Sequence, residues 1–423
     1  MDILTLLQGM QCSCGRCHCC DIQYVVIEKD AIAGLGNITN EYQNILLVAD
    51  ENTYAAAGEK TENALKDKHL RKVVFSGKTV LIPNEEAIDR VLQEMDGIEL
   101  IIGIGSGVIQ DLCKYVSLKR AVPYYIVATA PSMDGYASTG AAMILEGMKV
   151  TVSAGVPAAI IADTEVLKHA PMEMLQAGYG DIVGKFSALN DWKLSRIIKD
   201  EYFCQEIYDL TMDMVHKTLE LADGILQRKE ESVKVLMEAL VNVGIAMSFA
   251  GSSRPASGSE HHLSHFFEIS GIVHGEEYFP HGIDVAYSTV VTAKLRETIL
   301  TKPWPEKQYR PEREDYISQI RRIYGPVADG CVALQDRVGL YQQDMLSVYK
   351  EKETQIRNVL AEMPGAAEIQ KLLGAVGLDM DAFYKLYSAE KMNDAVHYAK
   401  ELKDRYTVLW MYYDMFGEKT YEF

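Results

Sequence analysis

Residues 100–111 read Leu-Ile-Ile-Gly-Ile-Gly-Ser-Gly-Val-Ile-Gln-Asp, an apolar run that meets three closely spaced glycines and continues as a helical pattern. Glycines let the backbone approach a ligand, and a helix N-terminus offers N–H groups and a partial positive charge to phosphate. The spacing Gly-x-Gly-x-Gly matches neither the Rossmann fingerprint nor the P-loop. The stretch therefore predicts a phosphate-binding turn, or else a tight strand-to-helix turn without a ligand.

Short β-branched runs alternate with helix-like spacers on both sides of this stretch. The expected strands cover residues 24–28, 45–50, 73–76, 100–105, 124–129 and 158–163. This alternation predicts an α/β nucleotide-binding domain with a parallel sheet covered on both faces. From about Thr164 long amphipathic stretches follow one another, which predicts an all-α C-terminal domain. We expect a Cys-rich arm at 1–22, the α/β domain at 23–165 and the helical domain at 166–423.

The charge balance limits the partners of the chain. Its 423 residues include 42 Lys and Arg against 60 Asp and Glu, a formal net charge of −18. Such a charge repels nucleic acids and anionic membranes. No run of 18 apolar residues and no secretory signal is evident. We therefore expect a cytoplasmic protein with no nucleic-acid partner and no membrane span.

Histidines gather in the second half of the chain. Residues 253–265 read Ser-Arg-Pro-Ala-Ser-Gly-Ser-Glu-His-His-Leu-Ser-His, and His281 follows sixteen residues later. His261 and His265 are spaced to share one face of a helix. Upstream, residues 178–185 are expected to start a helix with Asp181 in its first turns. One carboxylate with two imidazoles suits a catalytic divalent metal with an open position for substrate. The alternative is a set of structural, hydrogen-bonded histidines.

Two further segments carry weaker signals. Residues 129–138 follow a predicted strand, where ligands of open α/β sheets bind, although a plain connecting loop explains them equally well. Five of the eight cysteines fall in residues 12–20, where Cys14 and Cys17 have the spacing of half a zinc ribbon without a second pair. We expect a reduced, flexible arm, with a metal or redox role as the alternative.

Together these segments resemble the dehydroquinate synthase-like and iron-containing alcohol dehydrogenase superfamily, and within it the sn-glycerol-1-phosphate dehydrogenases, including the bacterial AraM-type branch. The resemblance extends from about Tyr24 to residues 397–409. It rests on residues 103–114, 129–138, 178–192, 253–268, 281–282 and 405–407. The block at 253–265 discriminates best, because general alcohol and glycerol dehydrogenases of the superfamily carry different residues around their histidines.

The resemblance implies roles for individual residues. The implied metal ligands are Asp181, His261 and His281, with His261 preferred to His262 because it follows the glutamate directly. The implied cofactor, NAD(H) or NADP(H), would contact Asp50, Gly105, Ser106, Gly107, Asp111, Thr129, Ser132 and Ser138. Asp134 and Lys185 would lie at the reacting part of the substrate, and Arg254 and His265 would bind its phosphate, unless Arg254 serves as a cap or salt bridge.

The reaction implied by the resemblance is NAD(P)H-dependent reduction of dihydroxyacetone phosphate to sn-glycerol 1-phosphate, a step of phospholipid metabolism. One divalent ion, Zn, Ni or Fe, would act as Lewis acid. We also expect a homo-oligomer, in the simplest case a homodimer. The alternatives are an NAD-linked dehydrogenase of an unphosphorylated polyol such as glycerol, a dehydroquinate synthase-like cyclising lyase, and a catalytically silent binding protein.

Overall fold

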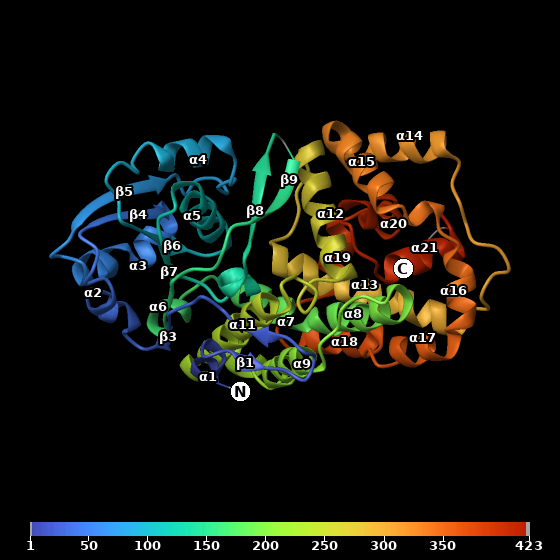
Figure 1. The fold of residues 1–423 in the computed structure, drawn as a ribbon, viewed down its shortest axis with the longest axis horizontal. Coiled ribbons are helices and arrows are strands. Elements are labelled where there is room, and N and C mark those ends of the chain that lie inside the picture. The colour runs from blue at the N-terminus through green and yellow to red at the C-terminus, as the bar shows by residue number, and fades with distance from the viewer. Residues whose placement is uncertain (1, 147, 420–423) are drawn as a thin grey trace. The chain divides into compact units, whose positions relative to one another are not determined.

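The computed structural model describes residues 2–146 and 148–419 (Figure 1). The chain divides into two compact units. Unit 1 comprises Met1–Ile182 and Asp209–Ser253, and unit 2 comprises Val183–Tyr208 and Arg254–Phe423. This division differs from the predicted boundary at residue 165, because α11 (Glu230–Ala250) packs against the α/β elements of unit 1 and adds its segment to that unit.

Unit 1 is built on a six-stranded parallel sheet. The strand order is β3-β10-β7-β6-β4-β5. The bounds are β3 (Tyr24–Glu28), β4 (Asn44–Asp50), β5 (His69–Phe75), β6 (Leu100–Gly105), β7 (Tyr124–Ala128) and β10 (Ala159–Asp163). All six predicted strands are confirmed. The edge strand β5 begins four residues before the predicted strand, because its first half exposes polar side chains to solvent and lacks an apolar signal.

Helices cover both faces of this sheet, as predicted. Alternate residues of β4 point to opposite faces. Leu46 and Val48 pack with α4 (Glu85–Leu92) and α5 (Gly107–Arg120). Ile45 and Leu47 pack on the other face, whose cover is η1 (Ala31–Gly34), α2 (Leu35–Ile38) and α3 (Glu51–Ala64).

Two antiparallel hairpins were not predicted. One is formed by β8 (Gly140–Leu145) and β9 (Met148–Ser153), and its first strand has only one β-branched residue. The other is formed by β1 (Met10–Gln11) and β2 (Cys17–His18). The N-terminal arm, expected to be flexible, instead folds as α1 (Ile3–Leu7) followed by this hairpin, and both elements contact α11.

The remaining elements of unit 1 are helical. They are η2 (Asp134–Ala137), α6 (Thr164–Leu167), α7 (Met172–Val183), which ends at the unit boundary, α9 (Gln205–Leu219), which begins in unit 2, and α10 (Ala222–Leu226). Helix α11 is long and apolar enough to cross a membrane, but 78% of its most apolar window is buried in the protein, as in the core helix of a globular domain.

The described part of unit 2 is helical, which confirms the predicted all-α second half. Its long helices are α8 (Lys185–Lys199), α12 (Ser259–His274), α13 (His281–Thr301) and α14 (Arg313–Tyr324). Shorter helices follow: η3 (Gly325–Val327), α15 (Ala328–Val338), η4 (Leu340–Gln342), α16 (Met345–Glu351), α17 (Glu353–Leu360), α18 (Ala366–Gly374), α19 (Met380–Leu386), α20 (Ala389–Tyr398), η5 (Ala399–Leu402) and α21 (Val408–Phe416).

A buried carboxylate, Asp191 of α8, joins four helices of unit 2. Its Oδ2 accepts the backbone N–H of Ser259 at 2.7 Å, at the start of α12. Its Oδ1 accepts the Arg296 guanidinium of α13 at 2.8 Å and the backbone N–H of Val408, at the start of α21, at 2.9 Å. Asp191 thereby fixes the first turn of α12, the turn that carries His261.

Candidate active site

The carboxyl ends of β4 and β6 form a topological switch point. The chain leaves β4 through α3 toward β5, and it leaves β6 through α5 toward β7, on the other side. The two strands are neighbours with Ala49 opposite Ile104, so Asp50 and Gly105 end side by side. In open α/β sheets such a point opens the crevice in which ligands bind.

Gly105 and Gly107 at this edge have different surroundings. A Cβ on Gly105 would lie 2.7 Å from Ile109 of α5, so glycine lets the helix start directly over the end of the strand. A Cβ on Gly107 would meet no atom closer than Met133 at 3.8 Å. The open space beside Gly107, at the N-terminus of a 14-residue helix, fits a phosphate-binding turn better than a purely packed turn.

The polar residues after β7 lie next to this turn. The backbone N–H of Thr129 donates to Gly105 O at 3.1 Å, and Thr129, Ser132 and Ser138 are all buried. Ser138 Oγ lies 3.4 Å from Lys114 Nζ, and Asp111 lies 3.7 Å from the same nitrogen. Two predicted cofactor residues, Asp111 and Ser138, therefore lie beside the buried Lys114, which was not among the predicted site residues.

Asp50 has a structural task of its own. Its Oδ1 accepts the backbone N–H groups of Asn52 and Thr53 at 2.8 and 2.9 Å, which caps the N-terminus of α3. A side chain that binds the cofactor ribose from this position must also hold the cap.

Asp134 and Asp181 are brought together within unit 1. The backbone N–H of Asp134 donates to Asp181 Oδ2 at 2.9 Å, and both side chains are buried. The contact depends on close packing, since a Cβ on Gly178 of α7 would lie 1.9 Å from Pro131 O. A Cβ on Gly244 of α11 would likewise lie 2.8 Å from Asp134 O. Two glycines thus let two helices close on the segment after β7.

Three histidines form a cluster within unit 2. The ring centroid of His261 lies 5.0 Å from that of His281 and 6.2 Å from that of His265, and His265 lies 5.5 Å from His281. His261 Nδ1 lies 2.7 Å from Glu260 Oε1, and His281 Nδ1 lies 3.2 Å from Ser264 Oγ. Hydrogen bonding at Nδ1 orients each ring and leaves Nε2 as the nitrogen for a metal. The Nε2 atoms of His261 and His281 are suitable ligands for a divalent ion.

Glu260 and His262, the chain neighbours of His261 in the first turn of α12, are also buried. His262 is fully buried. Burial lowers its pKa well below the usual range, and the positive charge of Arg405 lowers it further. Burial raises the pKa of the Glu260 carboxyl, and the charge of Lys185 opposes that rise. Lys185, predicted to lie near the substrate, is therefore buried within electrostatic range of Glu260, the partner of His261.

Arg254 does not have the surroundings expected of a phosphate ligand. Its side chain is buried, with Nε donating to Glu201 at 2.7 Å, Nη1 to Tyr406 O at 2.9 Å and Nη2 to both Glu201 and Ser195. All three nitrogens are engaged by protein groups. The arrangement agrees with the salt-bridge alternative, and the expected role of Arg254 at the substrate phosphate stays a prediction.

The chain is similar in sequence to known dehydrogenases. A model of the iron-containing alcohol dehydrogenase family matches residues 26–171. The NAD(P)+-linked glycerol-1-phosphate dehydrogenase of Geobacillus stearothermophilus is 31% identical over 378 residues, 87% of this chain and 86% of the relative. That of Halalkalibacterium halodurans is 29% identical over 95% of this chain and 94% of the relative. The chain belongs to the glycerol-1-phosphate dehydrogenase family.

Solved structures agree with this fold. Sulfoacetaldehyde reductase from Bifidobacterium kashiwanohense, in complex with NAD+, superposes with a TM-score of 0.62 at 13% identity, over 96% of this chain and 99% of that one. The iron-containing alcohol dehydrogenase of Thermococcus thioreducens gives 0.60 at 12% identity, over 92% and 97%. The two-domain architecture of a glycerol-1-phosphate dehydrogenase is therefore shared with more distant dehydrogenases.

A further cation, Arg405, lies next to the histidine-rich block of this member of the glycerol-1-phosphate dehydrogenase family. It was not among the predicted site residues. Its Nη1 donates to Ser257 O at 3.1 Å, inside the histidine-rich block. Burial, followed by the neighbouring charge of Arg254, lowers the pKa of Arg405 to about 10. Residues 405–407 were among the segments that carried the resemblance, so the signal was present, but nothing local distinguished this arginine from a surface charge.

Proposed function

We propose that the protein reduces dihydroxyacetone phosphate to sn-glycerol 1-phosphate with NAD(P)H and a divalent metal. The observation that carries the proposal is the 31% identity to the glycerol-1-phosphate dehydrogenase of Geobacillus stearothermophilus, over 87% of this chain. The site geometry supports the proposal. In unit 1 the carboxyl ends of β4 and β6 suit a dinucleotide, and unit 2 has a cluster of imidazoles. The protein would act in the cytoplasm as a homo-oligomer on a small phosphorylated substrate.

We assign the cofactor to the carboxyl ends of the neighbouring strands β4 and β6. Its pyrophosphate would lie over Gly105, Ser106 and Gly107, where the α5 N-terminus favours negative charge. Thr129 and Ser132, on the adjacent segment, would contact the same ligand. Asp50 would accept hydrogen bonds from the adenosine ribose and repel a 2′-phosphate, which predicts a preference for NADH.

We expect Asp50→Ser to shift the NADPH to NADH ratio of kcat/KM toward NADPH by about 1 to 2 kcal/mol, the scale of a charge-assisted hydrogen bond. Serine also caps helices well, so α3 should keep its N-terminus and stability should change little. The ratio is measured from steady-state kinetics with each cofactor, with thermal unfolding as the control. An unchanged ratio in a stable Asp50→Ser protein would remove Asp50 from the cofactor site.

The metal is assigned to Asp181, His261 and His281. His261 and His281 have their Nδ1 atoms held by Glu260 and Ser264, and the Asp181 carboxylate is oriented by the Asp134 N–H. A divalent ion bound by these residues supplies a Lewis acid for the substrate carbonyl. Zn, Ni and Fe all suit one carboxylate with two imidazoles.

The substrate phosphate needs local cations, because the chain as a whole is strongly acidic. We assign this task to Arg405, supported by His265, in place of Arg254, whose guanidinium is held by Glu201. Arg254 would then position Arg405 by holding the Tyr406 carbonyl next to it in the chain. Asp134 and Lys185 remain our candidates for the groups that orient the reacting end of the substrate and supply its proton.

We expect Arg405→Ala to raise KM for dihydroxyacetone phosphate about 10- to 100-fold, the loss of one charge-assisted contact, and to leave kinetics with unphosphorylated dihydroxyacetone nearly unchanged. Arg254→Ala should instead lower the unfolding temperature, because it leaves buried partners without their donor. Steady-state kinetics on both substrates and thermal unfolding separate the two. Equal losses on both substrates in Arg405→Ala would rule out a phosphate role.

The proposed function is tested by following NADH with matched ketones and added Zn, Ni or Fe. We expect oxidation with dihydroxyacetone phosphate and far slower oxidation with dihydroxyacetone. The opposite preference would select the polyol dehydrogenase alternative. Turnover of a phosphorylated substrate without net NADH consumption would select the cyclising lyase, because a synthase of that kind regenerates its cofactor.

A further inference from the structure

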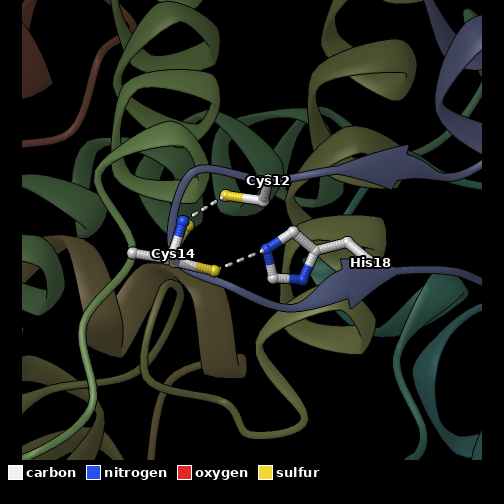
Figure 2. Close-up of side chains that lie close together, drawn as sticks. Cys12, Cys14 and His18 are labelled. Carbon is white, nitrogen blue, oxygen red and sulfur yellow. Dashed lines mark hydrogen bonds between the residues drawn. The ribbon is translucent and has the colours of Figure 1, made fainter.

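The N-terminal hairpin places three metal-binding side chains together (Figure 2). β1 and β2 pair with Met10 opposite His18 and Gln11 opposite Cys17. The turn between them is closed by the Cys12 N–H on Arg16 O and the Gly15 N–H on Cys12 O, both at 3.1 Å. Gly15 has φ +85°, which glycine adopts without strain. One potential ligand atom from each of Cys12, Cys14 and His18 lies within 4.8 Å of the others.

The backbone of the turn contacts the sulfur of Cys12. The N–H of Cys14 points at Cys12 Sγ from 3.4 Å. An N–H group beside sulfur stabilises negative charge there, and the thiolate is the form of cysteine that binds metals. Figure 2 shows this contact and the approach of Cys14 Sγ to the His18 ring, at 3.4 Å from Nε2.

His18 is oriented as a metal ligand requires. Its side chain is buried, and Nδ1 lies 2.9 Å from the carbonyl oxygen of Phe249 on α11, with the two rings stacked at 5.6 Å. A carbonyl oxygen only accepts, so Nδ1 carries the hydrogen. In the neutral ring Nε2 then presents its lone pair on the side of the Cys14 sulfur. Metal-binding histidines commonly have their other nitrogen held in this way.

We propose that Cys12, Cys14 and His18 bind a zinc ion, at a site separate from the one assigned to catalysis. Two thiolates and an imidazole suit zinc, and the hairpin leaves one position of a tetrahedral ion for a further donor. Through His18 and Phe249 the ion would fasten the hairpin to α11. The ligand set differs from the Cys14 and Cys17 pair suggested by spacing, since Cys17 is exposed.

Cobalt substitution in the full-length protein tests the proposal. Cobalt bound by cysteine gives an intense sulfur-to-metal charge-transfer absorption, which a site of carboxylate and imidazoles cannot give. We expect this band in the wild-type protein, and its loss in Cys12→Ser/Cys14→Ser. The matched control is Cys17→Ser/Cys19→Ser, which changes two exposed cysteines of the same arm and should keep the band.

A second measurement on the wild-type protein needs no variant and so does not depend on a variant folding. Zinc should slow alkylation of Cys12 and Cys14 by iodoacetamide, read by peptide mass spectrometry, and leave Cys17 and Cys19 unchanged. The proposal is overturned if the wild-type protein shows no sulfur-to-cobalt band, if Cys12→Ser/Cys14→Ser keeps it, or if zinc does not slow alkylation of Cys12 and Cys14 more than that of Cys17 and Cys19. None of these readouts requires dehydrogenase activity, so the proposal stands or fails independently of the proposed reaction.

Discussion

His261→Ala and His281→Ala should each lower kcat/KM with dihydroxyacetone phosphate by about 10³-fold or more and reduce the metal bound at the catalytic site. Each substitution removes one of three proposed protein ligands, and a Lewis acid supplies several kcal/mol of transition-state stabilisation. Metal content is measured by mass spectrometry of the purified proteins. It is best compared in the Cys12→Ser/Cys14→Ser background, so that zinc on the N-terminal hairpin does not mask the loss.

The matched control for these variants is His274→Ala. His274 lies at the other end of α12, is exposed, and has its Nε2 2.9 Å from Ile323 O. Its replacement should leave both metal content and turnover close to wild type. Full metal content together with full activity in His261→Ala or His281→Ala would refute the ligand assignment.

Asp191→Ala should cost about 3 to 5 kcal/mol of stability, the scale for removing one partner of a buried ion pair. The substitution leaves the Arg296 guanidinium in the core without its carboxylate and removes the acceptor for the first N–H groups of α12 and α21. The expected observation is a clear fall in the midpoint of urea unfolding, followed by circular dichroism. Activity should fall with it, because the histidine-bearing turn of α12 loses its anchor.

An exposed ion pair gives the control for this prediction. Arg321 and Asp329 lie 3.4 Å apart with both side chains mostly exposed. Asp329→Ala should therefore change stability by no more than about 0.5 kcal/mol. Equal midpoints for Asp191→Ala and Asp329→Ala would show that the buried network does not hold unit 2 together.

The parallel sheet was predictable because its central strands are apolar on both faces. Ile101, Ile102 and Ile104 of β6 are all fully buried, so the strand appears in the sequence as a continuous hydrophobic run. The β8–β9 hairpin was missed because Gly140 to Leu145 contains a single β-branched residue and packs through Ala141 and Met143. The strand conformation of β8 therefore comes from tertiary contacts rather than from local preference.

The candidate site was predictable only in part, because partners distant in sequence decide what a side chain does. Arg254 stands in the histidine-rich block, yet its guanidinium is held by Glu201, 53 positions upstream. His18 receives its orientation from Phe249, 231 positions away. The glycine-rich turn before α5 was predictable, because it depends on residues that follow one another in the chain. Strand β6, the turn and helix α5 are consecutive, so the local sequence already indicates this part of the site.

The enantiomer of the product tests the central claim most directly. The protein, loaded with a divalent metal, is incubated with NADH and dihydroxyacetone phosphate, and the glycerol phosphate formed is offered to a dehydrogenase specific for sn-glycerol 3-phosphate. We predict that NADH is oxidised and that the product is sn-glycerol 1-phosphate, which the second enzyme leaves untouched. Complete oxidation of the product by the second enzyme, or no oxidation of NADH with any of the three metals, would contradict the proposed function.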